Sequence, residues 1–320
     1  MKKLLLISAY DSDFVKTDVE ILRKHFSLDK LIRKKRQKNL LDFLVLALLI
    51  YWKAGKTDLI YCWFADSTAF LAVKAAKLFH KKICVNVGGY EVANEENYGG
   101  MKSRSAGRIK YVLNNADQII TVSGFSAEEI IKLGVQPEVV SLGIIPEQRR
   151  FPKQKIILTV GSAIDEIYRI KGLDLFAEAT GYFPKYQSMI IGKFEEKIKN
   201  KLLEINPDLI FCGQITHEAV IKNMQKAEVY CQFSKRESFG YALLEAMNGG
   251  CKTVISDAGA LPEIGGKGAV IVKEYTAEAC AEGIRQALEN PQPDQRNWIQ
   301  KNYSVQRREN ALTAILDSLE

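Results

Sequence analysis

The chain has 320 residues, of which 47% are hydrophobic and 26% charged, with a formal net charge of +7. This length and balance exclude a disordered chain and suit two globular domains of roughly 150 residues each. The apolar start at residues 4–7 is shorter than a secretory signal, and the longest apolar run, residues 40–52, is shorter than the ~20 residues that span a bilayer. We therefore expect a cytoplasmic protein without a transmembrane helix.

The first half of the chain alternates short apolar runs with helix-length segments. The runs expected to form strands are residues 3–9, 58–63, 83–87, 118–122 and 138–141. The helices expected between them are residues about 17–25, 39–53, 67–79, 103–114 and 126–133. This order predicts a parallel sheet covered on both faces, because parallel strands need long crossover connections.

The second half repeats this alternation. Its expected strands are residues 155–160, 188–191, 208–211, 228–233, 252–255 and 269–272. Its expected helices are residues about 172–180, 194–205, 217–226, 240–248, 276–289 and 305–319. Two such alternations in succession predict two Rossmann-like domains.

Two proline-containing breaks mark the domain boundaries. The first lies at residues 143–152, with Pro146 and Pro152, and the second at residues 291–293. We expect one domain at residues 1–145 and another at residues 151–298. The final helix, about residues 300–320, is expected to pack back on the first domain.

The positive charge is concentrated between Arg23 and Lys38, which contains eight basic residues and one acid, Asp29. Such a patch attracts phosphate groups. The apolar helix predicted directly after it is typical of interfacial segments. We expect either a solvated loop or contact with an anionic membrane surface, and we do not expect nucleic acid as a partner.

The clearest functional pattern runs from Ser234 to Gly250, after the strand predicted at residues 228–233. Gly240 allows close backbone approach and opens a helix, whose first N–H groups and positive dipole end suit a diphosphate. Glu237 precedes the helix, and Glu245 lies two turns further on, roughly 12 Å away. The residues expected to hold the phosphorylated ligand are Glu237, Ser238, Phe239, Gly240, Tyr241, Ala242 and Glu245.

The spacing Glu237-x7-Glu245, together with residues 239–240 and 244–247, resembles the signature of retaining family 4 glycosyltransferases. Residues 250–264 are similar to the strand and loop that follow in that family. The resemblance implies the GT-B fold, an α/β architecture of two Rossmann-like, doubly wound parallel-sheet domains facing across a cleft. It implies an acceptor-side first domain and a second domain that binds the nucleotide sugar. It also implies that Glu237 contacts the donor sugar and Glu245 the ribose.

A second pattern begins the C-terminal domain. The strand predicted at residues 155–160 ends at Gly161, and after a loop Lys171-Gly172 opens a helix. Arg169 and Lys171 are suited to neutralise a diphosphate. The family that the chain resembles has a basic pair here that contacts the donor phosphates. It often has an arginine directly after the glycine, where this chain has Ser162.

A third candidate lies in the first domain, where Gly88, Gly89, Tyr90 and Glu91 follow the strand predicted at residues 83–87. Paired glycines after a parallel strand permit a ligand to approach the backbone. In related enzymes this loop faces the transferred sugar or the acceptor. Glu91 is a candidate for acceptor contact, with a solvated carboxylate as the alternative. Many members of the family carry a histidine in this region; this chain does not, and no histidine is assigned a role.

Metal binding is not expected. Asp11-x-Asp13 directly follows the first predicted strand, where Asp13 suits a helix cap, and no Cys or His cluster has zinc spacing. None of the six cysteines forms a C-x-x-C pair, which is typical of reduced thiols. Lys171, Arg169 and the helix start near Gly240 would take the place of a metal in stabilising the leaving diphosphate, while Glu237 orients the sugar.

The sequence therefore predicts a metal-independent, retaining glycosyltransferase without a cofactor. It would move a sugar from a nucleotide-sugar donor to a glycan or lipid-linked acceptor, in synthesis of a cell-envelope polysaccharide. A nucleotide-sugar epimerase and a non-catalytic binding module stay open as alternatives. A nicotinamide-dependent oxidoreductase is disfavoured, because the G-x-G-x-x-G fingerprint is missing from the sequence.

Overall fold

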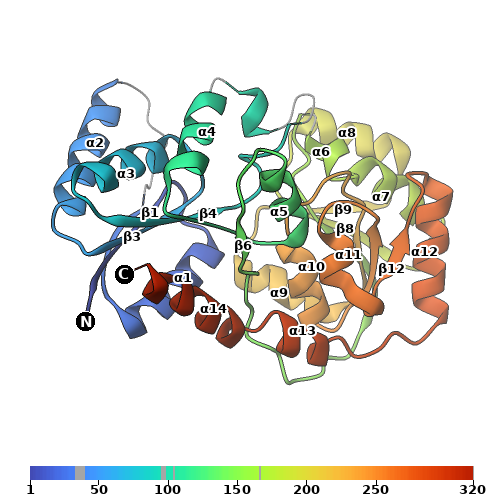
Figure 1. Ribbon diagram of the computed structural model, residues 1–320. Helices are drawn as coiled ribbons and strands as arrows, with labels where there is room; N and C mark the ends of the chain where they lie inside the picture. The colour runs from blue at the N-terminus through green and yellow to red at the C-terminus, as the bar shows by residue number, and fades with distance from the viewer. Residues whose placement is uncertain (33–39, 95–98, 104, 166, 320) are drawn as a thin grey trace. The chain divides into compact units, whose positions relative to one another are not determined.

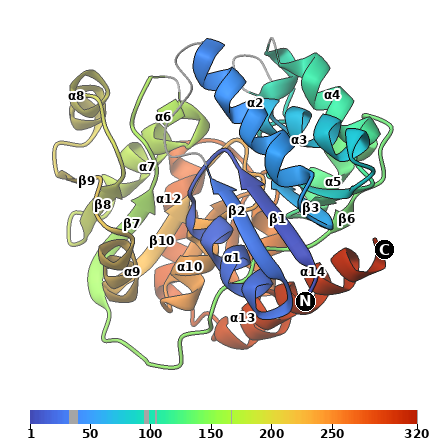
Figure 2. The ribbon, with the colours of Figure 1, turned by 90° about the vertical axis from the view of Figure 1, so that its left-hand side faces the viewer.

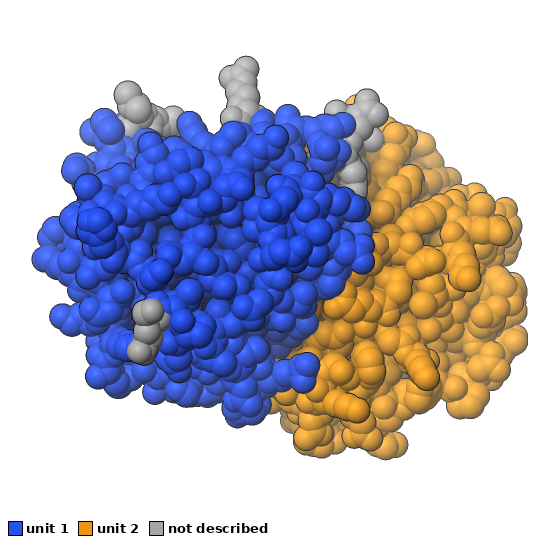
Figure 3. Space-filling view, in the orientation of Figure 1, with its two compact units in different colours: residues 1–143, 305–320 blue, residues 144–304 orange. Residues whose placement is uncertain are grey.

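The computed structural model describes residues 1–32, 40–94, 99–103, 105–165 and 167–319. They form two compact units, coloured separately in Figure 3: one of Met1–Gly143 with Val305–Glu320, the other of Ile144–Ser304. Each unit contains a six-stranded, all-parallel sheet with flanking helices (Figures 1 and 2). The expectation of two Rossmann-like, doubly wound parallel sheets is confirmed.

The first sheet has the strand order β2-β1-β3-β4-β5-β6. Its strands are β1 (Lys3–Ser8), β2 (Ser27–Ile32), β3 (Leu59–Trp63), β4 (Lys82–Val87), β5 (Gln118–Thr121) and β6 (Glu138–Val139). The helices of this unit are α1 (Asp13–His25), α2 (Leu40–Ala54), α3 (Ser67–Leu78), α4 (Ala106–Asn115), α5 (Gly124–Ile131) and α14 (Val305–Ser318). Helices α2, α3 and α4 lie on one face of the sheet, and α1 and α14 on the other (Figures 1 and 2).

The second sheet has the strand order β12-β11-β10-β7-β8-β9. Its strands are β7 (Gln154–Val160), β8 (Gln187–Ile191), β9 (Leu209–Gly213), β10 (Ala227–Gln232), β11 (Lys252–Ser256) and β12 (Val270–Val272). The helices of this unit are α6 (Ile167–Ile170), α7 (Leu173–Thr180), α8 (Glu196–Ile205), α9 (His217–Lys226), α10 (Tyr241–Asn248), α11 (Leu261–Gly265), α12 (Ala277–Glu289) and α13 (Arg296–Asn302). From β7 the chain adds β8 and β9 on one side, and from β10 it adds β11 and β12 on the other side. The direction of winding therefore reverses between β7 and β10.

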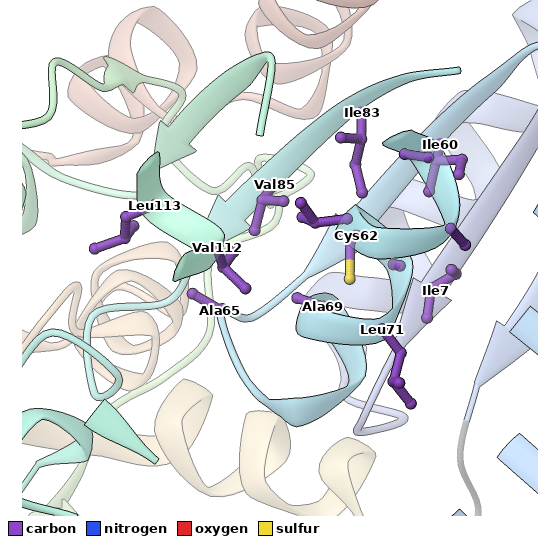
Figure 4. Close-up of a cluster of buried hydrophobic side chains, with 14 of the residues drawn as sticks. Ile7, Ile60, Cys62, Ala65, Ala69, Leu71, Ile83, Val85, Val112 and Leu113 are labelled. Carbon is purple, nitrogen blue, oxygen red and sulfur yellow. The ribbon is translucent and has the colours of Figure 1, made fainter. Parts of the chain in front are cut away.

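The core of the first unit follows from the alternation of strand side chains. Residues two apart on β1, β3 and β4 face α2, α3 and α4, and they are almost completely removed from water. Each such Ile, Leu or Val contributes about 1.5–3 kcal/mol relative to an exposed position. Figure 4 shows members of this cluster: Ile7, Ile60, Cys62, Ala65, Ala69, Leu71, Ile83, Val85, Val112 and Leu113.

On the opposite face, α14 is fastened to the first unit by a buried ion pair. Arg308 donates to both carboxylate oxygens of Asp18 on α1, at 2.6 and 2.8 Å. The same carboxylate accepts from the Tyr61 hydroxyl and the Trp63 indole, both at 2.7 Å. The arginine also donates to the carbonyl of Val140 at 2.7 Å. These contacts satisfy the buried charges, as such groups require.

The helix expected at residues 305–319 is observed as α14, whereas the stretch before residue 305 is not part of it and contains a separate helix, α13. Helix α13 belongs to the second unit and α14 to the first, with the division between Ser304 and Val305. The first division likewise falls between Gly143 and Ile144, inside the polar break. Among the described residues, no helix combines the length and the apolar composition needed to cross a bilayer.

The basic segment contains a strand that the sequence did not reveal. Arg23 and Lys24 end α1, and β2 then runs parallel to β1 with Ser27 opposite Lys3. The edge position explains the polar composition of β2, in which Asp29 and Lys30 are exposed. The reading of this stretch as a plain loop was therefore wrong for residues 27–32. Residues 33–39, which hold the remaining cations, lie outside the described residues.

Candidate functional site

The candidate site lies where β7 and β10 are adjacent in the second sheet. In doubly wound sheets, ligands bind beyond the carboxyl ends of the strands at the point where the winding reverses. Lys171 lies in the connection that follows β7, between α6 and α7, and Glu237 lies in the loop after β10. Strand order therefore brings together two residues that are 66 positions apart in the sequence.

Glu237 is held by two donors on one carboxylate oxygen. The ammonium of Lys171 lies 2.8 Å from Oε2, and the side-chain amide of Gln232 donates to the same atom, also at 2.8 Å. The side chains of Lys171 and Glu237 are 30% and 17% exposed, so the pair is accessible from solvent. A cation and a carboxylate held this way suit a ligand that combines negative charge with hydroxyl groups.

The orientation of the Gln232 side chain is set by Tyr230, which lies two residues earlier on β10. The Tyr230 hydroxyl donates to Oε1 of Gln232 at 3.1 Å, which leaves the amide nitrogen to face Glu237. Burial raises the pKa of Tyr230 well above its usual value, and the charges of Glu237 and Glu245 raise it further. The tyrosine therefore keeps its proton and stays a donor. Gln232 was not predicted from the sequence, although a glutamine two residues after a tyrosine in an apolar strand indicates that the two side chains can hydrogen-bond on the same face.

Two glycines allow the loops to pack closely around this group. Gly172 precedes α7 with φ of 65°, and a Cβ there would lie 2.0 Å from the carbonyl oxygen of Phe233. Gly240 caps α10 with φ of 92°, and a Cβ there would lie 2.9 Å from Leu261. A larger residue at either position would displace the loop. Helix α10 thus begins at Tyr241, four residues after Glu237, and its first N–H groups have no acceptor within the helix.

The other residues predicted around α10 have distinct environments. Ser238, Tyr241 and Ala242 are partly exposed, as ligand contacts require. Phe239 is buried and packs edge-to-face on Tyr303, with ring centroids 6.0 Å apart. Its side chain therefore stabilises the loop and does not face a ligand.

Two further predicted residues, Gly161 and Arg169, lie near the start of the second unit. Gly161 directly follows β7, and its N–H donates to the carbonyl of Ile191 at 2.9 Å. Arg169 lies on the short helix α6, where its exposed guanidinium sits 5.4 Å from the ring centroid of Tyr168. Its part in binding phosphate stays a prediction.

Glu245 lies on the buried side of α10 and is paired with a histidine. Nε2 of His217 lies 2.5 Å from Oε1 of Glu245, whose side chain is only 7% exposed. Glu245 also lines a cavity of about 300 Å³ within the second unit. No role was assigned to His217 from the sequence, yet it follows β9 and starts α9, at the same edge of the sheet as Glu237. Strand-end position was the signal that could have found it.

In the first unit, the environment of Glu91 corrects the expectation of a solvated carboxylate. The residue is buried, and Oε1 accepts from the backbone N–H groups of Ala65 and Gly88, both at 3.1 Å. Burial raises the pKa of Glu91 above its usual range, although these hydrogen bonds act against the shift. The carboxyl group thus ties the loop after β4 to the loop after β3.

This loop borders a cavity of about 350 Å³ with a mostly apolar lining. Gly89 has φ of 106°, and Tyr90 is 53% exposed. The rings of Tyr10 and Phe64 meet edge-to-face at 5.3 Å. The residues that line the cavity are Tyr10, Phe64, Ala65, Asp66, Tyr90, Glu91, Gly100, Ser103, Ser105 and Ile109.

The side chains of the types that bind metal ions do not form a metal site in the described part of the chain. Within residues 1–32, 40–94, 99–103, 105–165 and 167–319, no three His, Cys, Asp or Glu side chains are grouped to hold an ion. All six cysteines are free thiols, and five of them are buried.

Solved structures with the same architecture include a sucrose-phosphate synthase and a protein in complex with UDP and glucose. The sucrose-phosphate synthase of Thermosynechococcus elongatus superposes with a TM-score of 0.81 and 17% identity, covering 100% of this chain and 99% of that one. Anabaena HepE in complex with UDP and glucose superposes with a TM-score of 0.78 and 14% identity, covering 99% and 100%. At these identities the likeness shows the fold alone, which is that of GT-B glycosyltransferases.

Comparison of the amino-acid sequence identifies a relative and a family. The phosphatidyl-myo-inositol mannosyltransferase of Mycobacterium tuberculosis is 30% identical over 143 residues, which cover 42% of this chain and 38% of that protein. The match thus spans well under half the length of this relative. The family model described as glycosyl transferases group 1 matches residues 143–305, just over half of the chain. This protein is accordingly a member of the glycosyl transferases group 1 family, with the GT-B fold.

Proposed function

We propose that this glycosyltransferase moves a sugar from a nucleotide-sugar donor to a glycan or lipid-linked acceptor, with retention at the anomeric carbon. The observation that carries the proposal is the Lys171–Glu237 pair, 2.8 Å apart at the winding reversal and followed directly by the start of α10. A site of this kind matches both parts of a nucleotide sugar: the anionic diphosphate and the neutral, hydroxyl-rich sugar. The UDP and glucose bound to HepE support a donor of this class.

In this proposal, each residue acts on one part of the donor. Lys171 and the first N–H groups of α10 neutralise the diphosphate, with Arg169 as an additional cation. Oε2 of Glu237 already accepts from Lys171 and Gln232, so Oε1 is the oxygen left to accept from sugar hydroxyls. Glu245, which His217 holds in place, addresses the ribose.

The chemistry breaks the bond between the anomeric carbon and the diphosphate oxygen. The transition state resembles an oxocarbenium ion, while negative charge grows on the leaving phosphate. Fixed positive groups stabilise that charge without reorganising, which is the main contribution proposed for Lys171 and the start of α10. The acceptor hydroxyl bonds to the anomeric carbon from the side on which the diphosphate leaves and passes its proton to the leaving phosphate oxygen, which gives retention without a protein nucleophile.

The proposed acceptor is a sugar on a cell-envelope glycan or its lipid-linked precursor. Aromatic rings suit the apolar faces of sugars, and the exposed Tyr10 and Tyr90 and the partly exposed Phe64 supply such rings around the cavity of the first unit. The name of the mannosyltransferase relative indicates a phosphatidylinositol acceptor for that protein. The cations between Arg23 and Lys38 support a peripheral position at the inner face of the cell membrane.

The proposal is tested by incubating the protein with a panel of UDP- and GDP-sugars, with and without glycan acceptors, and measuring release of nucleoside diphosphate and sugar transfer. Glu237→Gln should abolish transfer while the protein stays folded. Glu204→Gln, which alters an exposed carboxylate on α8, is the matched control and should keep full activity. Full transfer by Glu237→Gln would contradict the assigned role. A new epimer formed from donor alone would favour the epimerase alternative.

A further inference from the structure

Helix α2 presents an unusual apolar face to solvent. Six large apolar side chains on it are between 40% and 71% exposed. They are Leu41, Leu44, Val45, Leu48, Leu49 and Trp52. Their spacing of three and four residues places them on one stripe that covers roughly 140° of the helix circumference. The stripe, called here the α2 face, runs along the whole helix.

The opposite side of α2 fixes the helix on its unit. Leu46, Ile50 and Ala54 are buried in the core described above, and Phe43 and Tyr51 pack at its edge. The α2 face is therefore exposed although the other side of the same helix is firmly packed in the core. Monomeric proteins rarely leave a contiguous apolar stripe of this size in water unless it binds something.

Dimensions and composition favour a lipid surface. With 15 residues, α2 is about 22 Å long, too short to cross the ~30 Å hydrocarbon core. An apolar face backed by protein is instead suited to lie in the plane of the interface. Trp52 ends the stripe, and the ammonium of Lys56 lies 3.8 Å from its ring centroid. Tryptophan beside lysine is typical of the headgroup level of a membrane.

The surrounding charge indicates an anionic lipid. Lys56 follows the C-terminal end of α2, and Lys53 near that end is already paired with Asp29 at 2.6 Å. In the sequence, five of the seven residues that directly precede Leu40 are Lys or Arg, although these seven lie outside the described residues. The acid on α2 itself is Asp42. A second copy of the chain would bring like charges together, whereas anionic headgroups would neutralise them.

We propose that the α2 face inserts into the interfacial region of an anionic bilayer and is the membrane anchor of this protein. The inference deepens the proposed function, since it rests on the membrane position suggested there and assigns it to particular side chains. Binding to lipid vesicles requires neither donor nor acceptor, so its failure is distinguishable from failure of the transfer reaction.

The test is co-sedimentation of the full chain with phosphatidylcholine vesicles, with and without phosphatidylglycerol. We expect binding to the mixed vesicles and a loss of about tenfold or more in the Leu44→Gln/Leu48→Gln/Trp52→Gln variant. The matched control, Tyr182→Gln/Ile205→Gln/Ile210→Gln, changes exposed apolar residues of the second unit and should bind like the wild type. The altered α2 residues are exposed, so melting temperatures should be similar.

A second measurement locates the contact directly. Vesicles with brominated acyl chains should quench the fluorescence of Trp52, and the Trp52→Phe variant should lose most of this quenching. Equal vesicle binding by wild type and the α2 variant would overturn the proposal. It would also be overturned if wild type ignored anionic vesicles but self-associated in sedimentation velocity, with the α2 variant monomeric, because a second copy would then cover the face.

Discussion

Lys171→Met is the sharpest test of the proposed donor site. Methionine keeps most of the length of the lysine stem and removes the ammonium that lies 2.8 Å from Oε2 of Glu237. Gln232 still donates to that oxygen, so the carboxylate keeps one partner. Because the pair is partly exposed, its loss should lower the free energy of unfolding by about 1 kcal/mol or less. The variant should therefore fold.

The expected effect on donor binding is larger. A hydrogen bond to a charged group contributes about 1.5–3 kcal/mol. The Lys171 side chain is 30% exposed, so solvent screening lowers the expectation to about 1–2 kcal/mol. At about 1.4 kcal/mol for each factor of ten, the dissociation constant of a nucleoside diphosphate should rise roughly 5- to 30-fold. Loss of the cation beside Glu237 acts in the same direction, because the carboxylate then repels the diphosphate.

Isothermal titration with UDP and with GDP measures this change. Lys171→Arg should lose less affinity, since the positive charge is kept. Lys199→Met is a matched control, because that lysine is also 30% exposed and paired with a glutamate, Glu196, but lies on α8. Raising the salt concentration should weaken binding more in wild type than in Lys171→Met. A dissociation constant for Lys171→Met within about twofold of wild type would refute the role given to this charge.

Three further variants test the supporting contacts. Arg308→Met leaves the carboxylate of Asp18 buried without its cation and should lower the free energy of unfolding by about 3–5 kcal/mol in urea; a loss under about 1 kcal/mol would contradict a buried pair. Burial raises the pKa of Glu91, so its neutral form stabilises the fold below the unfolded-state pKa near ~4.3, and this stability is lost as pH rises through the higher folded-state pKa. In Glu91→Gln, the free energy of unfolding should therefore fall less than in wild type between about pH 4 and 7; parallel curves would argue against the burial effect. His217→Ala should raise KM for the donor about 3- to 10-fold with little change in kcat, because Glu245 loses the group that positions it; an unchanged KM would exclude that role.

The sequence predicted most of the fold because the strands are apolar and separated by helix-length segments. It missed β2, whose six residues include Ser27, Asp29 and Lys30. An edge strand pairs on one side only and tolerates polar side chains, so neither alternation nor an apolar run marks it. The position of β2 becomes evident only from its pairing with β1.

The candidate site was predicted in part for a similar reason. Glu237 and Lys171 belong to local patterns at strand ends, and such patterns can be read along the chain. Gln232 and His217 take their roles from partners 5 and 28 residues away, which strand order and helix packing bring near. For Glu91, the two expectations were acceptor contact and a solvated loop carboxylate; the carboxylate is instead buried and accepts from backbone N–H groups of two different loops. The sequence around Glu91 does not indicate that these two backbone N–H groups will lie beside its carboxylate.

The two sheets make different chemical environments at equivalent positions. In the first unit, the winding reverses between β1 and β3, and the loops after them place Tyr10 and Phe64 at a mostly apolar cavity. In the second unit, the same position holds the Lys171–Glu237 pair and the start of α10. A diphosphate gains charge-assisted hydrogen bonds only where cations and N–H groups meet it, and desolvation next to an apolar wall would cost affinity. The donor is thus expected to bind the second unit by itself, and loss of charge there should weaken diphosphate binding while changes around Tyr10 leave it intact.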